Sequence, residues 1–414
     1  MNRPHLFHYS KLLLYLCSEE LFEMKKTLKF LLGMLGGAAI GTTIVCIFVL
    51  LIDGDLSGFH SFSEIKMGKL ALSISYCFLS LAIAVVLNIM LHEAGHLLFG
   101  LLTGYKFVSY RAFSFTLMKN QQGHFIWKRF SISGTLGQCL MEPPRDVKPE
   151  KLPYFWYNAG GVIVNLLLAI GSVALLRSSH LPMFWECFFF MMAFVATALA
   201  LINGLPLQSA GLNNDGSNIL QLYRHPEKRT DLQHQLLIVA ETSKGKRTVE
   251  MPAEWFPNPV ITDYKETITL ATKNNYICWL EDNLRFGEAL QEIETLMEHE
   301  QEVAQLIRME LGCDWLMLEL VMQNRPSQIE RINTKQQWDY LQTTSKYSAM
   351  RLATLYAWQL IHEHNPEEAE KVFTQLKNNQ NSYAFLGEAR TAIALIEHIK
   401  TIYHGTRTNT ESAQ

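Results

Sequence analysis

Residues 81–104 read LAIAVVLNIMLHEAGHLLFGLLTG, an apolar stretch whose ionisable side chains are His92, Glu93 and His96. Roughly 20 apolar residues are enough for a helix to cross the core of a bilayer. On a helix, residues four apart lie on the same face, so the two imidazoles are expected to lie side by side. Ionisable groups within a membrane helix are costly and usually functional. The stretch therefore predicts a membrane-spanning helix that carries a polar site.

Other apolar stretches surround this one. They predict about four spans, at about 29–52, 70–104, 157–177 and 183–203. Segment 29–52 carries no charge after Lys29, so it is expected to span. The sequence therefore predicts a mainly α, polytopic helical membrane protein with a small β-rich, membrane-associated loop and a C-terminal cytosolic helical domain that resembles a repeat.

The rest of the chain is divided by composition. We expect an N-terminal tail at 1–27, a membrane core at 28–222 with a β-rich loop at 105–156, a linker at 223–260, a helical repeat-like domain at 261–404 and a disordered tail at 405–414. Within the loop, two aromatic and β-branched stretches flank Gln121-Gln122-Gly123, which predicts a hairpin. In the C-terminal half, the periodicity predicts helices near 264–285, 286–299, 302–323, 344–364, 366–378 and 383–402.

Composition and charge exclude some classes of partner. The chain has 49% apolar and 18% charged residues and a net charge of −3, with no basic stripe, so no nucleic-acid partner is expected. Its seven cysteines form no C-x-x-C pair, which indicates reduced cysteines that serve in packing. Basic residues before the first span and in the 105–156 loop predict that both termini are cytoplasmic.

His92-Glu93-Ala94-Gly95-His96 is the sharpest chemical motif. In a helical H-E-x-x-H motif both imidazoles can bind one Zn²⁺, and the glutamate can act as the general base. A random chain of this composition is expected to contain roughly 0.04 such matches. His362-Glu363-His364 does not form a second metal motif, because residues two apart diverge on a helix, and we expect these histidines at the surface.

A zinc site of this type needs a third protein ligand. Asp215 follows the last span on the side of the membrane where the motif lies, so it is the candidate; an exposed turn is the alternative. Asn165 lies in the third span beside Gly160 and Gly161. It could hydrogen-bond an oxyanion or a peptide backbone, and a role in joining two helices is an equal alternative.

These motifs, in this order, resemble the site-2 protease family of intramembrane zinc metalloproteases. The resemblance covers roughly residues 70–220 and includes the Asn203…Pro206…Asp215-Gly216 segment. It implies that His92, His96 and Asp215 bind Zn²⁺ and that Glu93 activates water, with Asn165 near the active site. It also leads us to expect substrate contacts at Asn203 and Pro206, and alignment of extended substrates by residues 105–140. The chain departs from the family in the longer Leu207–Asn214 insertion, which makes the third ligand less secure.

The resemblance implies a zinc-dependent endopeptidase in a bacterial cell membrane, with the lipid bilayer as its surroundings. The expected substrates are transmembrane or membrane-tethered peptides, among them pheromone precursors, signal-peptide remnants and anti-sigma factors. The alternative is a catalytically silent, membrane-anchored scaffold whose helical domain recruits a cytosolic protein partner. A transporter or immunity protein would need more spans or a polar pathway, so we set it aside.

Overall fold

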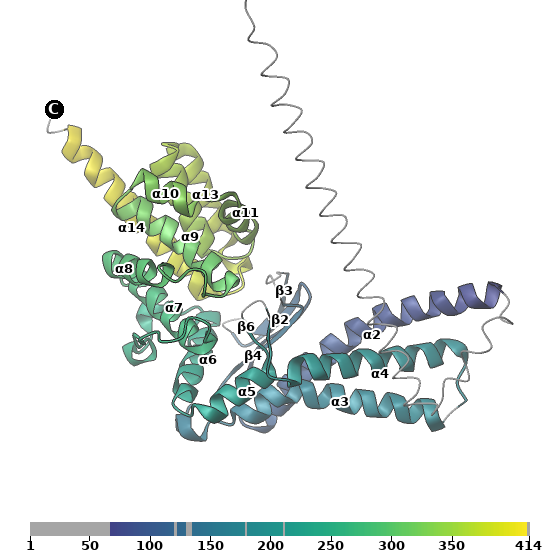
Figure 1. Ribbon diagram of the computed structural model, residues 1–414. Helices are drawn as coiled ribbons and strands as arrows, with labels where there is room; N and C mark the ends of the chain where they lie inside the picture. The colour runs from purple at the N-terminus through teal and green to yellow at the C-terminus, as the bar shows by residue number, and fades with distance from the viewer. Residues whose placement is uncertain (1–66, 120–121, 130–134, 179, 210–211, 412–414) are drawn as a thin grey trace, which may run out of the picture. The chain divides into compact units, whose positions relative to one another are not determined.

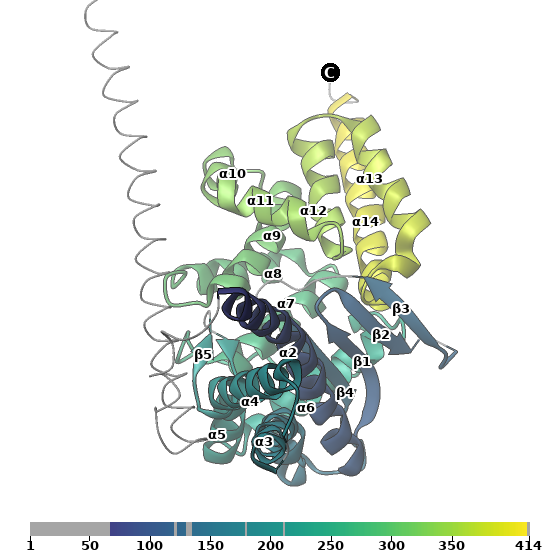
Figure 2. The same cartoon turned by 90° about the vertical axis from the view of Figure 1, so that its right-hand side faces the viewer.

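Three long apolar helices dominate the N-terminal half of the computed structural model, which describes residues 67–119, 122–129, 135–178, 180–209 and 212–411. They are α2 (Met67–Leu102), α3 (Tyr154–Ser178) and α4 (Met183–Gly204), and they run side by side (Figures 1 and 2). Each is long and apolar enough to cross a membrane. Three of the segments predicted to span a membrane are thus long apolar helices; the tail at 1–27 and the predicted span at about 29–52 lie outside the described residues.

The ends of these helices follow from local chemistry. Helix α2 ends at Leu102, and Gly104 takes a positive φ of 89° while Tyr105 N–H donates to Gly100 O at 3.0 Å. A glycine in this conformation is a common helix stop because it has no Cβ to clash. Helix α4 ends at Gly204, two residues before Pro206, whose ring cannot continue a helix.

Helices α2 and α3 approach each other through glycines. A Cβ atom added to Gly95 would lie 2.7 Å from the carbonyl carbon of Gly160 and 2.9 Å from the Cα of Gly161. These distances are too short for any side chain, so the two backbones touch directly. Small residues at such crossings allow close packing of membrane helices in the absence of a hydrophobic driving force.

The predicted β-rich loop forms a four-stranded antiparallel sheet in the order β3-β2-β1-β4. Its strands are β1 (Lys106–Ala112), β2 (Phe115–Lys119), β3 (Phe125–Arg129) and β4 (Gly137–Glu142). The predicted hairpin is present as β2 and β3, which pair antiparallel. The stretch before it contains two strands, because Phe113 adopts a left-handed φ of 56° and reverses the chain. No glycine or proline marks that turn in the sequence.

A short hairpin follows the last apolar helix. Its strands are β5 (Gln208–Ser209) and β6 (Leu212–Asn213), which pair antiparallel within the predicted insertion. Helices α5 (Asp215–Arg224) and α6 (Lys228–Ser243) come next. The segment 223–260, which we predicted to be a linker, thus holds a helix that packs against β4. Buried Glu142 of β4 and buried Glu241 of α6 both pair with Lys244, at 2.7 and 3.0 Å, which joins the two elements.

Helices also form the C-terminal region, as predicted. They are α7 (Thr267–Asp282), α8 (Phe286–Met297), α9 (Gln305–Met322), α10 (Pro326–Ile332), α11 (Lys335–Thr344), α12 (Met350–Ala357), α13 (Pro366–Asn379) and α14 (Leu386–Glu411), with a π-helical turn at Trp358–His362. Their core includes the fully buried Leu280, Ile293, Leu316, Leu341, Ala353 and Leu395. The prediction missed α10 and α11, which are short, and it began the disordered tail at 405, whereas α14 continues to Glu411.

The chain divides into two compact units. Of the described residues, the first unit contains 67–80, 172–178 and 180–194. There Cys77 Sγ lies 3.5 Å from Cys187 Sγ, so α2 and α4 are neighbours. The second unit contains the sheet, the rest of α2, α3 and α4, and all later helices. One reason is that α6 packs against both the sheet and α7.

The glycine contact between α2 and α3 predicts a large difference between two valine substitutions. Gly160→Val places a side chain against the backbone of Gly95, which cannot move aside, so a loss of about 1–3 kcal/mol or more is expected. Gly171→Val, on the same helix, meets nothing within 4 Å and should be tolerated. Thermal unfolding in detergent, followed by size-exclusion chromatography, measures both; equal melting temperatures would contradict the packing.

Candidate metal centre

Helix α2 supplies three buried polar residues to one site. His92, Glu93 and His96 have exposed fractions of 7%, 9% and 8%. The two imidazole Nε2 atoms lie 3.2 Å apart, as expected for residues four apart on a helix. The His96 Nδ1 atom lies 2.7 Å from the backbone carbonyl oxygen of Tyr157 on α3. A carbonyl partner at Nδ1 fixes the ring and leaves Nε2 free as a ligand.

Asp215 completes the cluster from the first turn of α5. Its Oδ2 atom lies 3.2 Å from His92 Nε2 and 3.4 Å from His96 Nε2, and its side chain is 18% exposed. Burial alone would raise the pKa of the Asp215 carboxyl, but His96 and His92 lower it to about 2. The alternative of an exposed turn is therefore wrong, and Asp215 presents an ionised oxygen to both imidazoles.

The Asn214 N-cap of α5 explains how Asp215 lies beside the two histidines despite the longer Leu207–Asn214 insertion. The Asn214 Oδ1 atom accepts from Ser217 N–H at 2.9 Å, which begins α5 in the usual way for an N-cap asparagine. The Asn214 Nδ2 atom donates to the carbonyl oxygens of Ile202 and Leu205, at 2.5 and 2.6 Å. The start of α5 is thus tied to the end of α4, and the extra residues are taken up by the β5–β6 hairpin.

The three candidate donor atoms are spaced as the corners of a tetrahedral metal site would be. Bonds of about 2.0–2.1 Å from zinc to nitrogen or oxygen give ligand separations of roughly 3.3 Å along a tetrahedron edge. The observed separations of 3.2, 3.4 and 3.2 Å match this edge. His92, His96 and Asp215 are also the residues that form a potential metal-binding group in the described part of the chain. The donor set therefore fits a divalent ion with one further position left for water.

Two glycines make room for these side chains. A Cβ atom on Gly161 of α3 would lie 2.6 Å from His92 Nε2 and 2.7 Å from His96 Nε2. A Cβ atom on Gly137 of β4 would lie 2.7 Å from Glu93 Cγ, so this backbone forms a wall against the glutamate. The sequence analysis assigned no role at the site to Gly137, and its surroundings carry no motif that marks it. Gly161 stood out in the sequence only as a neighbour of Asn165 in the third span.

Asn165 is fully buried on α3, four residues after Gly161 and so on the same helix face. Neither of its amide atoms has a hydrogen-bond partner in the described part of the chain. The alternative in which Asn165 joins two helices therefore finds no hydrogen bond to support it. A buried amide without a partner is costly, and it is available to a ligand.

Asn203 and Pro206 are not brought into the cluster by any contact of the described residues. The Asn203 Nδ2 atom donates to Leu199 O, on its own helix, at 3.0 Å. Pro206 is exposed in the segment between α4 and the β5–β6 hairpin. Substrate contact by these two residues stays a prediction.

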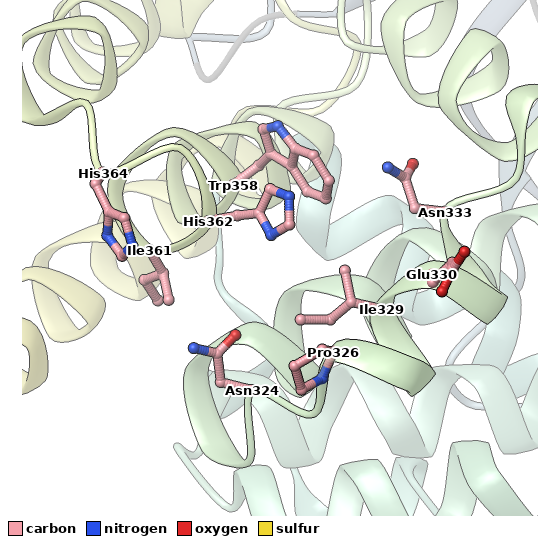
Figure 3. A pocket seen from close by; sticks show the side chains of 9 residues that line it. All are labelled: Asn324, Pro326, Ile329, Glu330, Asn333, Trp358, Ile361, His362 and His364. Atoms are coloured by element: carbon pink, nitrogen blue, oxygen red, sulfur yellow. The ribbon is translucent and has the colours of Figure 1, made fainter.

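A separate pocket of about 440 Å³ lies in the helical region, between the α10 segment and the π-helical turn (Figure 3). Its lining residues are Asn324, Pro326, Ile329, Glu330, Asn333, Trp358, Ile361, His362 and His364. Both histidines are exposed, as the sequence predicts, and both also line this pocket. None of the predicted site residues lies in the pocket.

Fold and site together define a largely helical protein with three helices that are suited to a membrane and a buried His–His–Asp cluster beside a glutamate. Comparisons of the chain with protein-family models, with curated proteins and with solved structures gave no match. The resemblance to site-2 proteases therefore rests on the residues themselves, and function is argued from their geometry.

The cluster predicts that metal content depends on ligands from two distant segments. Purified wild-type protein is expected to hold about one zinc per chain, and His92→Ala and Asp215→Ala are each expected to lose it, because two ligands rarely hold zinc tightly. Elemental analysis of detergent-purified protein measures the ratio. Zinc lost in His92→Ala and kept in Asp215→Ala would move the third ligand elsewhere.

Gly161 allows a second test that leaves all ligands in place. Gly161→Ala puts a methyl group against both imidazoles, so zinc content should fall while the chain still folds. Gly171→Ala, ten residues further along α3, has open space and should bind zinc normally. Equal zinc in both variants would show that the imidazoles can move away from α3.

Proposed function

We propose that the chain is an intramembrane zinc-dependent endopeptidase that hydrolyses peptide bonds in or near the membrane segment of its substrate. The observation that carries this proposal is the convergence of His92, His96 and Asp215, with Glu93 buried beside them on a helix suited to a membrane. Buried ionisable groups at membrane depth are expensive unless they serve a site.

His92, His96 and Asp215 would hold the ion. Bound zinc would supply a Lewis acid that lowers the pKa of a water molecule and polarises a carbonyl group. The Glu93 carboxylate is suited to accept a proton from the attacking water and to return it to the leaving nitrogen. Burial of His92, Glu93 and His96, with Asp215 only 18% exposed, limits competing bulk water and strengthens the electrostatic interactions among these groups.

Asn165 has the properties of a group that binds substrate. Its fully buried amide can donate to a carbonyl oxygen of the scissile segment and accept from a backbone N–H. A peptide that enters from the bilayer must unwind there, and its freed backbone groups need partners. The otherwise unpaired amide of Asn165 would provide one.

The finer assignments belong to the same proposal. We infer a multi-pass protein of a bacterial cell membrane with both termini in the cytoplasm, on the distribution of basic residues. Its substrates would be membrane-bound peptides such as pheromone precursors, signal-peptide remnants or anti-sigma factors. The helical region would face the cytosol, where its pocket (Figure 3) favours the alternative role of recruiting a protein partner.

The test is cleavage of tagged single-span peptides by protein reconstituted in liposomes. Glu93→Gln is expected to lower the rate by about 10²–10⁴-fold because it removes the proton acceptor, while zinc content stays near that of wild type. Glu186→Gln, at an exposed acid in the first turn of α4, is the matched control and should leave the rate unchanged. Zinc-loaded wild type without activity on any peptide would favour the silent scaffold, and full activity in Glu93→Gln would remove the proposed base.

A further inference from the structure

Arg111 of β1 is a fully charged side chain with an exposed fraction of only 1%. Its guanidinium donates from Nη1 to Phe113 O at 2.8 Å and to Thr135 O at 3.3 Å. From Nη2 it donates to Gly137 O at 3.3 Å and to Thr135 Oγ1. All four acceptors are neutral oxygens. Burying a guanidinium group among neutral groups costs free energy, so we expect Arg111 to have a function that offsets this cost.

The acceptors lie in two parts of the sheet. Phe113 belongs to the turn between β1 and β2, whereas Thr135 and Gly137 lead into β4. The planar fork of the guanidinium can hold several acceptors in fixed directions at once, which an ammonium group cannot. Arg111 therefore fixes the start of β4 at the point where Ala112 of β1 pairs with Gly137.

Gly137 in turn lies directly against Glu93. A Cβ atom at this glycine would lie 2.7 Å from Glu93 Cγ and 2.8 Å from Glu93 Cδ. The backbone of β4 thus limits where the glutamate can go. A continuous set of contacts runs from the Arg111 guanidinium through Gly137 to the Glu93 side chain.

Charge supports the same connection. No carboxylate of the described residues is in ion-pair contact with Arg111, and the acid that acts on it at longer range is Glu93. Burial lowers the pKa of Arg111, and the Glu93 charge raises it. In a low-dielectric surrounding such an interaction reaches beyond hydrogen-bond distance.

We propose that Arg111 is a positioning residue for the hydrolysis: through Gly137 it holds the wall that orients Glu93. The inference rests on the proposed function, because Glu93 needs a precise orientation only if it acts in catalysis. Arg111 touches neither metal ligand nor substrate in this role. Its loss is expected to lower kcat by about tenfold to 100-fold, the effect of misplacing a catalytic group by a fraction of an ångström to 1 Å.

The first arm of the test measures position without activity. In the double variant Glu93→Cys with Gly137→Cys, the introduced sulfur atoms should lie close enough for a disulfide after oxidation with diamide, which mass spectrometry identifies. Adding Arg111→Met is expected to reduce the yield of this cross-link about tenfold, because disulfide geometry is narrow. An unchanged yield would overturn the proposal.

The second arm compares kinetics in otherwise wild-type protein. Arg111→Met should lower kcat with KM within about twofold and zinc content unchanged, since only a catalytic group is displaced. Arg111→Lys keeps the charge and loses the fork, so it should recover little of the rate. Full recovery with lysine, or a kcat within twofold of wild type in the methionine variant, would overturn the positioning role. Arg285→Met, at an exposed arginine that begins α8, is the matched control.

The two arms separate the two proposals. If wild type cleaves no peptide and Arg111→Met still reduces the yield of the cross-link, the proposed function fails and the positional role of Arg111 stands. If the methionine variant does not fold, as judged by size-exclusion chromatography, the lysine variant decides both arms, with unchanged cross-linking and unchanged kcat counting against the proposal.

Discussion

The direct contact between the backbones of α2 and α3 is the constraint on which the site depends. Gly95 and Gly160 leave no space for a side chain, and Gly161 faces both imidazoles. Because the helices are this close, the Tyr157 carbonyl reaches His96 Nδ1 and fixes its ring. A larger crossing distance would move α3 away from the histidines and leave the ring without this partner. The small residues at this crossing thus allow the two packed helices to form one side of the site.

The polar side chains of the site are supported from three directions. Helix α2 provides the two histidines, the capped start of α5 provides Asp215, and the sheet closes the side of Glu93. Each support is a backbone contact or a short hydrogen bond, which suits a buried setting where unsatisfied polar groups are costly. The amide of Asn165 and the His92 Nδ1 atom are exceptions, since both are buried without a hydrogen-bond partner among the described residues. Unpaired groups of this kind are concentrated at sites that receive a ligand.

Sequence reasoning succeeded where length and composition alone decide structure. Helices α2, α3 and α4 follow from uninterrupted apolar stretches, which have few alternatives. It failed where a turn has no chemical marker, as at Phe113, and where helices are short, as for α10 and α11. Helix α6 was missed in the predicted linker at 223–260 for another reason. Helix α6 buries one side against β4 and α7, and a polar average over 223–260 conceals such a helix.

The sequence by itself determined three apolar helices long enough to cross a membrane. It also determined the pair His92 and His96, because a spacing of four residues on a helix is local geometry. It named Asp215 only as a candidate, since 119 residues (215 − 96) separate it from His96 and nothing local fixes that distance. Tertiary structure decided that the hairpin and the Asn214 cap bring Asp215 to the histidines. It also decided that Gly137, whose carbonyl oxygen accepts from Arg111, lies against Glu93. The physical reason is that contacts between distant segments depend on how helices and sheet pack, and packing depends on the whole chain.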